Sequence, residues 1–166
     1  MQAIEILDIK QFMRLLFQTD TLDHYEMVSA EIRTDISYSI DGKLNQSFYN
    51  KDELSLLQLE KNFFLPWQYA KEKIFSLIKG KKTPSLLKLI LKVNPIQAED
   101  ILSLSNSSLN SNDIDGFFLN IIFQENKLNV ICGLSYKIFT MDRELENYFS
   151  ENIITLFKSK DITCQY

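Results

Sequence analysis

A strict alternation over residues 28–41 constrains the fold more than any other feature of the sequence. The even positions carry mainly apolar side chains and the odd positions carry polar ones over fourteen residues, with Val28, Ala30, Ile32, Thr34, Ile36, Tyr38 and Ile40 on the even side. A period of two predicts a β-strand with one buried face and one wet face. Such strands are typical of antiparallel or mixed sheets and exclude a doubly wound fold, whose sheet is buried on both faces. Asp41-Gly42 then predicts a hairpin turn, with the returning strand over residues 44–48.

Spacings elsewhere predict further helices and strands. Strands are expected at residues 4–6, 85–93, 117–124, 128–134 and 136–140, and helices at residues 8–18, 52–62, 67–78, 95–104 and 142–160. Pro66 suits the start of the helix at residues 67–78, and Gly80 suits its end. The sequence therefore predicts an α+β fold, with helices packed on one face of a mostly antiparallel or mixed sheet.

Composition indicates the size and class of the molecule. The chain has 166 residues, is 45% hydrophobic and 24% charged, and carries a formal net charge of −4. These values are typical of a globular domain, so we expect one domain over residues 1–166. We expect no secretory signal, because residues 1–6 show no basic region followed by a continuous apolar stretch. We expect no membrane association, because the most apolar run, residues 86–93, is too short to cross a bilayer. Cys132 and Cys164 form no CxxC motif and are expected to be reduced thiols in a cytoplasmic protein.

The single histidine, His24, excludes every site that needs two imidazoles. It lies close to Asp20, Asp23 and Glu26. Carboxylates beside an imidazole could hold a metal or support acid–base chemistry. The segment also connects a predicted helix to a predicted strand, where aspartate is common as a turn-forming residue.

Two other segments resemble functional motifs only in part. Residues 111–116 (SNDIDG) are similar to the first half of an EF-hand loop, but the position that needs an acidic ligand falls on Ile122. Cys132 lies in the middle of a predicted strand, where a buried, unreactive thiol is expected. We therefore predict no catalytic residues, no metal site and no cofactor. Of Phe117-Phe118, one ring is expected in the core and the other is available for contacts.

Residues 71–92 form a basic segment in an acidic chain, with seven lysines and one glutamate and thus a local charge of +6. Its centre, Lys79-Gly80-Lys81-Lys82-Thr83-Pro84, is expected at a helix end and in the following loop. Ammonium groups and a hydroxyl at that place favour the binding of phosphate or another anion. The pattern also has a structural explanation, because lysines stabilise helix C-termini and discourage edge strands from pairing. It is not a P-loop, because the helix ends here rather than begins.

Three segments resemble a family of uncharacterised bacterial proteins, mostly from low-GC Gram-positive species. They are residues 76–84 (SLIKGKKTP), 116–121 (GFFLNI) and 133–142 (GLSYKIFTMD), and residues 40–45 (IDGKLN) are similar to the same family. The resemblance spans nearly the whole chain and implies a bacterial cytoplasmic protein, with no activity attached. It also singles out residues 79–84 and 135–142 as a shared surface if the two segments meet. The anion-binding residues expected on such a surface are Lys79, Lys81, Lys82, Thr83 and Lys137.

The sequence favours a non-enzymatic binding or regulatory module that takes an anionic ligand or a partner protein at a basic loop, Lys79–Lys82. The ligand could be a nucleotide or an RNA backbone, although the acidic net charge argues against broad nucleic-acid binding. One alternative is a small enzyme with a cleft around Asp23, His24 and Lys79. The other is a homo-oligomer, such as a homodimer, that assembles through an edge strand or through Phe117-Phe118.

Overall fold

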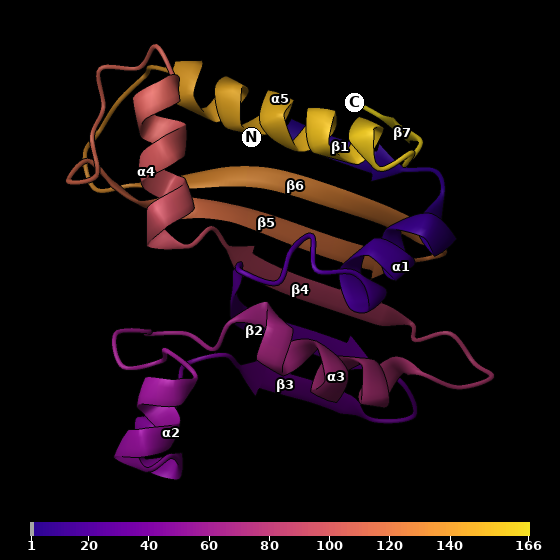
Figure 1. The fold of residues 1–166 in the computed structure, drawn as a ribbon. Coiled ribbons are helices and arrows are strands. Elements are labelled where there is room, and N and C mark those ends of the chain that lie inside the picture. The colour runs from indigo at the N-terminus through magenta and orange to yellow at the C-terminus, as the bar shows by residue number, and fades with distance from the viewer. Residues whose placement is uncertain (1) are drawn as a thin grey trace.

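The computed structural model describes residues 2–166, which form a seven-stranded antiparallel sheet with helices packed on one face (Figure 1). The strand order is β3-β2-β4-β5-β6-β1-β7. The strands are β1 (Gln2–Ile6), β2 (Glu26–Arg33), β3 (Ser37–Asp41), β4 (Leu86–Lys92), β5 (Ile114–Gln124), β6 (Lys127–Tyr136) and β7 (Cys164–Gln165). The helices are α1 (Ile9–Gln18), α2 (Lys51–Leu56), α3 (Trp67–Ile78), α4 (Pro95–Leu104) and α5 (Glu144–Ser159), with a 3₁₀ turn η1 (Gln46–Phe48). The predicted α+β fold is confirmed, and each neighbouring pair of strands is antiparallel.

The core lies between the sheet and helices α1, α3 and α5. On β4 and β5, alternate residues such as Leu89 and Leu119 are fully buried, whereas Lys88 and Asn120 are partly exposed on the opposite face. The strand alternation therefore separates an apolar layer from a mixed, wetter one. Aromatic rings bridge the layers: the ring centroids of Phe117 on β5 and Phe149 on α5 are 5.1 Å apart, and those of Phe12 on α1 and Phe157 on α5 are 5.5 Å apart.

Helix α3 is fixed to the rest of the core at its first residue. Trp67 is fully buried, and its Nε1–H donates a 2.8 Å hydrogen bond to the carbonyl oxygen of Leu16 at the end of α1. The other end follows the sequence prediction, because α3 stops at Ile78 and Gly80 adopts a φ of +148°, a conformation that disfavours other residues. The chain then crosses an exposed loop to β4.

The alternation over residues 28–41 comes from two strands rather than one. β2 ends at Arg33 and β3 begins at Ser37, with the backbone N–H of Thr34 bonded to the carbonyl of Ile36 in the turn between them. Ala30 pairs with Ile40 and Ile32 with Tyr38, so even residues share one face from Ala30 to Ile40. A β-bulge between Met27 and Ser29 shifts the register before that, and Met27 rather than Val28 is buried. The alternation of apolar and polar residues therefore continues through the turn, and the pattern alone does not show that a turn is there.

The hairpin predicted at Asp41-Gly42 and the strand predicted at residues 44–48 are wrong. Gly42 packs against β2 instead: its N–H bonds to the carbonyl of Val28, and a Cβ at this position would lie 1.7 Å from the carbonyl oxygen of Met27. Glycine is required there because the two backbones touch. Lys43 makes only an isolated bridge with Phe64, and residues 43–65 leave the sheet as an excursion, called here the 43–65 segment.

The helix predicted at residues 52–62 is shorter and begins one residue earlier. Asn50 and Glu53 form a capping box at the start of α2, with reciprocal hydrogen bonds of 2.8 and 3.0 Å. Gln58 adopts a left-handed φ of +55°, which ends the helical turn, and the N–H of Leu59 bonds back to the carbonyl of Leu54. Leu59 is thereby turned inward and buried.

Two differences concern the C-terminal third of the chain. The predicted strand at residues 136–140 is absent, because β6 continues to Tyr136 and the residues from 137 to 143 have no regular structure. The sequence analysis also missed β7, whose two residues pair with Ile6 and Glu5 of β1 at the edge of the sheet. A strand of two residues carries no detectable period.

Candidate functional site

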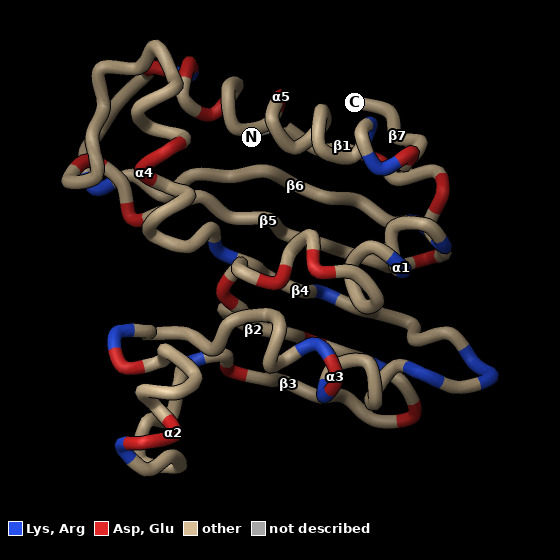
Figure 2. Tube along the Cα trace, in the orientation of Figure 1, with Lys and Arg blue, Asp and Glu red and all other residues tan. Residues whose placement is uncertain are grey.

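The basic loop, residues 79–83, is exposed at the end of the sheet where α3 ends and β4 begins. The side chains of Lys79, Lys81, Lys82 and Thr83 are all exposed. Within residues 2–166, none of the three lysines forms an ion pair with a carboxylate. The loop is tied to the β2–β3 turn by a 2.9 Å backbone hydrogen bond from Ser85 to Arg33. Figure 2 shows the positive positions gathered along this protruding loop after α3.

Lys137 does not join this cluster. Its N–H bonds to the carbonyl of Asp113, next to Ile114 at the start of β5, whereas Leu86 at the far side of the basic loop pairs with Gln124 at the end of β5. β5 has 11 residues, so these two places are roughly 30 Å apart at about 3.3 Å per residue. The structure therefore does not bring residues 135–142 to the basic loop.

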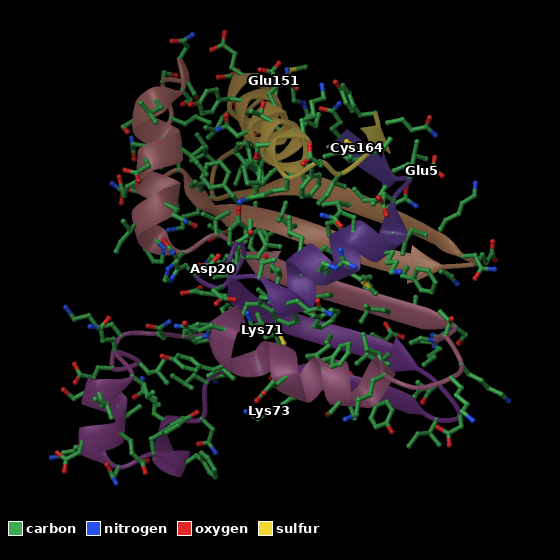
Figure 3. The ribbon with its side chains drawn as sticks, turned by 45° about the vertical axis from the view of Figure 1, so that its right-hand side comes forward. Glu5, Asp20, Lys71, Lys73, Glu151 and Cys164 are labelled. Atoms are coloured by element: carbon green, nitrogen blue, oxygen red, sulfur yellow. The ribbon has the colours of Figure 1, made fainter. Side chains whose placement is uncertain are left out.

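The remaining lysines of the basic segment point in several directions. The ammonium of Lys71 lies 2.6 Å from the Asp23 carboxylate and 3.0 Å from the carbonyl oxygen of Thr19. Lys73 leaves α3 on another side of the helix, away from Asp20 (Figure 3). Lys92 lies on the sheet face opposite the helices, with its ammonium 5.8 Å from the centre of the Phe118 ring. The lysines that give the local charge of +6 therefore lie on several surfaces. Three of them, Lys79, Lys81 and Lys82, are neighbours in the basic loop.

The structure does not assemble the cleft expected around Asp23, His24 and Lys79. His24 is exposed, and its side chain has no hydrogen bond or ion pair within the described part of the chain. Asp23 is held by Lys71, which leaves its carboxylate poorly placed as a general base. Its carbonyl accepts from the N–H of Gln68 at the start of α3, about 17 Å along the helix from Lys79.

Other acidic residues considered as metal ligands or acid–base groups are buried or hydrogen-bonded elsewhere. Glu26 is buried, which raises the pKa of its carboxyl, and the charge of Lys92 opposes this shift. In the partial EF-hand sequence, Asp113 accepts from the N–H of Asn110 and Asp115 accepts from the hydroxyl of Ser135. Across residues 2–166, no three histidine, cysteine, aspartate or glutamate side chains are grouped as metal ligands would be.

The thiols and the aromatic pair occupy the places that the sequence predicts. Cys132 is fully buried, and this burial raises the pKa of its thiol to about 12, against the smaller opposing effect of the Ser150 hydroxyl. Such a thiol is not a nucleophile near neutral pH. Phe117 is in the core, whereas Phe118 is half-buried on the face opposite the helices. In the part of the chain that the structure describes, no helix has the length and apolarity needed to span a bilayer.

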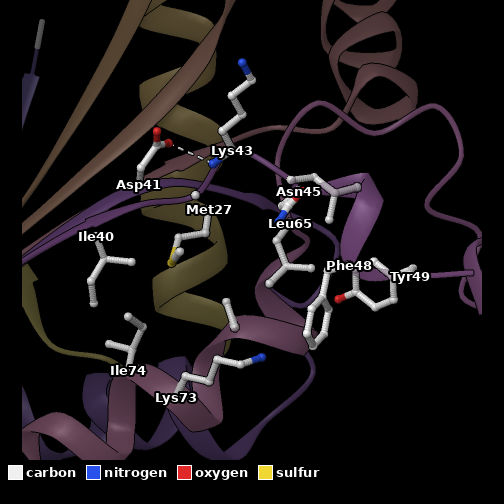
Figure 4. A pocket seen from close by; sticks show the side chains of 13 residues that line it. Met27, Ile40, Asp41, Lys43, Asn45, Phe48, Tyr49, Leu65, Lys73 and Ile74 are labelled. Atoms are coloured by element: carbon white, nitrogen blue, oxygen red, sulfur yellow. Dashed lines mark hydrogen bonds between the residues drawn. The ribbon is translucent and has the colours of Figure 1, made fainter.

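A pocket of about 320 Å³ lies between β3, α3 and the start of the 43–65 segment (Figure 4). Its volume is at the lower end of the roughly 300–1,000 Å³ of small-molecule sites. Its walls are mainly aliphatic, and its apolar contributors come from several separate parts of the chain: Met27, Ile40, Leu44, Phe48, Leu65 and Ile74. Lys43, Lys73 and Asp41 also line it.

Comparison with known proteins shows which family the chain belongs to. A family model matches residues 14–165. The chain belongs to DUF5721, a family of unknown function. This confirms the expected membership in an uncharacterised family. No curated protein and no solved structure matches the chain. The basic loop and the pocket of this DUF5721 protein both lie inside the matched region, and family membership assigns an activity to neither.

Sequence reasoning found the basic loop of the DUF5721 chain but missed the pocket. The loop is contiguous, so its charge can be counted directly from the sequence. The pocket combines residues from 27 to 74 that meet only after β2, β3 and α3 have packed. The sequence does show two apolar residues of the pocket, Leu44 and Phe48, but the strand predicted there gives them no common partner.

Proposed function

We propose that this DUF5721 protein is a non-enzymatic binding module whose basic loop contacts an anionic partner. One observation carries the proposal: three lysines within four consecutive positions are exposed, and none is paired with a carboxylate in residues 2–166. We propose that residues 1–166 act as one α+β domain that presents this loop. The single hydrophobic cluster that joins the sheet to α1, α3 and α5 supports this.

The position of the lysines favours binding over a purely structural role. A lysine in the last turn of a helix is stabilised by the helix dipole, but that effect falls off within one turn. Lys79 is the C-cap of α3, so its placement has this structural explanation. Lys81 and Lys82 lie beyond the helix end, in a loop without regular structure. Their mutual repulsion is unfavourable in the free protein, and a bound anion would relieve it.

The proposed contact surface consists of Lys79, Lys81, Lys82 and Thr83, with the hydroxyl of Thr83 as a neutral donor beside the ammonium groups. Lys137 is outside it. We also propose that the protein acts in the cytoplasm of a bacterium of the low-GC Gram-positive group. The segment resemblance supports the source, and the two free thiols, Cys132 and Cys164, support the compartment.

The test is retention on a heparin column, a generic polyanion, during a salt gradient. The variant replaces Lys79, Lys81 and Lys82 with alanine. The matched control replaces three exposed, dispersed lysines, Lys10, Lys51 and Lys61, with alanine. Both variants remove three positive charges from a chain of net charge −4. Because the proposal requires locally concentrated charge, the loop variant should elute at clearly lower salt than the wild type, and the control should elute close to it.

Two results would contradict the proposal. The first is flow-through of the wild-type protein at low salt, which would mean that the loop does not attract polyanions. Equal shifts of the two triple variants would show that only the net charge matters. Circular dichroism spectra of both variants establish that the comparison is made between folded proteins.

A further inference from the structure

The residues that line the pocket beside α3 include none of the basic loop. The inner wall of the pocket consists of Met27 on β2 and Ala70 and Ile74 on α3, all of them buried side chains. Leu44 and Phe48 approach from the 43–65 segment, and Phe48 is left 79% exposed. Because most of these side chains are aliphatic, the hydrocarbon chain of a ligand can cover them without leaving a polar group unpaired.

Two small residues, Gly42 and Ala70, are among those that line the pocket. Gly42 is pressed against β2 and has no room for a side chain, because a Cβ would overlap the carbonyl of Met27. Ala70 is the smallest side chain on the buried face of α3, between Trp67 and Ile74. Of the two, only Ala70 leaves space at the pocket, because a side chain at Gly42 would meet the backbone of β2. The space of about 320 Å³ opens to solvent, and the walls that remain exposed in it are mainly apolar.

One positive charge is directed at this apolar space. Lys73 extends along the pocket toward Phe48, whereas the Lys43 side chain points away (Figure 4) and places its ammonium 5.4 Å from the centre of the Phe63 ring. The ammonium of Lys73 has no ion pair in the described residues, and its hydrogen bond is a long one, 3.4 Å to the carbonyl of Tyr69 on its own helix. The Asp41 carboxylate accepts a 2.8 Å hydrogen bond from the backbone N–H of Lys43, so it already has a donor.

We propose that this pocket binds a small amphipathic monoanion, a medium-chain carboxylate, with its hydrocarbon chain against Met27, Ile40 and Ile74 and its carboxylate at Lys73. A hydrocarbon chain removes water from the aliphatic walls, which gains free energy in proportion to the apolar area covered. The carboxylate supplies the acceptor that the Lys73 ammonium lacks. A single available ammonium fits one negative charge, and an amphipathic cation would meet repulsion from it.

Isothermal titration calorimetry with decanoate, decanol and decyltrimethylammonium tests the proposal, because the three probes share one chain and differ in charge. Decanoate should bind about fivefold tighter than decanol, the order expected of one partly exposed charged hydrogen bond. Decyltrimethylammonium should bind more weakly than decanol. All titrations stay below the concentrations at which the probes form micelles.

Two variants and a matched control identify the site. Lys73→Met keeps the length of the side chain and removes its charge, so it should weaken decanoate binding about fivefold and leave decanol unchanged. Lys51→Met makes the same change at an exposed position on α2 that does not line the pocket, and should change neither. Ala70→Leu fills the inner wall and should weaken both probes about tenfold or more.

Three results would overturn the proposal: no decanoate binding to the wild type at roughly 1 mM, equal affinities of the Lys73→Met and Lys51→Met variants, or equal binding of all three probes. If Ala70→Leu does not fold, the comparison of Lys73→Met with Lys51→Met still decides, because both substitutions are at exposed positions. Heparin retention of Lys73→Met is measured alongside and should be close to that of the wild type, because Lys73 is outside the basic loop. The decanoate result and the heparin result therefore test the two proposals separately.

Discussion

Two buried ionisable groups make the stability of this protein sensitive to alkaline pH. Cys132 on β6 is fully buried, and Tyr25, which precedes β2, is 8% exposed. Burial raises the pKa of the Cys132 thiol from 9.0 to about 12. Burial, reinforced by the charge that Cys132 would carry, raises the pKa of Tyr25 from 10.0 to about 12. The folded protein therefore keeps both groups neutral at a pH where the unfolded chain has lost both protons.

The direction of the effect follows from proton linkage. A group whose pKa is higher in the folded state contributes stability that is complete below the unfolded pKa and is lost as the pH rises toward the folded pKa. The window here is pH 9 to 12 for Cys132 and pH 10 to 12 for Tyr25. At 1.36 kcal/mol per pKa unit, raising the pH from 8 to 11 costs about 3 kcal/mol through Cys132 and about 1 kcal/mol through Tyr25.

Urea unfolding followed by far-UV circular dichroism, under reducing conditions at pH 8 and pH 11, measures this loss. The wild type should lose about 4 kcal/mol from these two groups between the two pH values, a large share of a typical stability of 5–15 kcal/mol. Cys132→Ala should lose about 3 kcal/mol less than the wild type over the same interval, and Tyr25→Phe about 1 kcal/mol less. Surface lysines and tyrosines titrate alike in all three proteins, so they cancel in the comparison. An equal loss in wild type and Cys132→Ala would refute the reasoning.

The remaining predictions also concern stability, and urea unfolding measures each of them. Trp67→Phe removes the donor to the Leu16 carbonyl and leaves that oxygen buried without a partner. The free energy of unfolding should therefore fall by about 1–3 kcal/mol at neutral pH. An unchanged unfolding midpoint would contradict the stabilising role of this hydrogen bond. Burial raises the pKa of Glu26 above 4.5 more than Lys92 lowers it, so the stability that this shift contributes is present below pH 4.5 and lost as the pH rises. The wild type should therefore lose stability relative to Glu26→Gln between pH 4 and pH 7, and the opposite trend would show that Lys92 dominates.

The fold class was predictable because each strand and helix has a local period, but the path of the chain was not. Even residues pair with even residues across the β2–β3 turn, as Ala30 with Ile40, so the alternation is the same for one long strand and for this hairpin. Asp41-Gly42 then looked like the turn, although the glycine is needed for the close approach of Gly42 to Met27. A local pattern cannot distinguish a glycine that turns the chain from one that admits a neighbouring backbone.

The candidate sites differ in predictability for the same reason. The basic loop depends on neighbours in sequence, and the structure leaves it exposed as the composition of residues 79–83 suggests. Lys137 was grouped with it on the condition that two distant segments meet, and strand β5 separates them by its full length. The pocket depends on contacts between β2, β3 and α3, whose order in the sheet depends on long-range pairing.

Helix α3 contributes to both proposed sites, yet it keeps them apart. Lys73 and Lys79 are six residues apart, about 9 Å along the axis and about 240° around it, so the two side chains leave the helix in different directions. A change at one lysine should therefore leave the other site intact, whereas Trp67→Phe loosens the whole helix and would disturb both. The loop variant should bind decanoate with wild-type affinity, and Lys73→Met should elute from heparin near the wild type. Weaker decanoate binding by a folded loop variant would mean instead that the two surfaces form one site, with the carboxylate shared along α3.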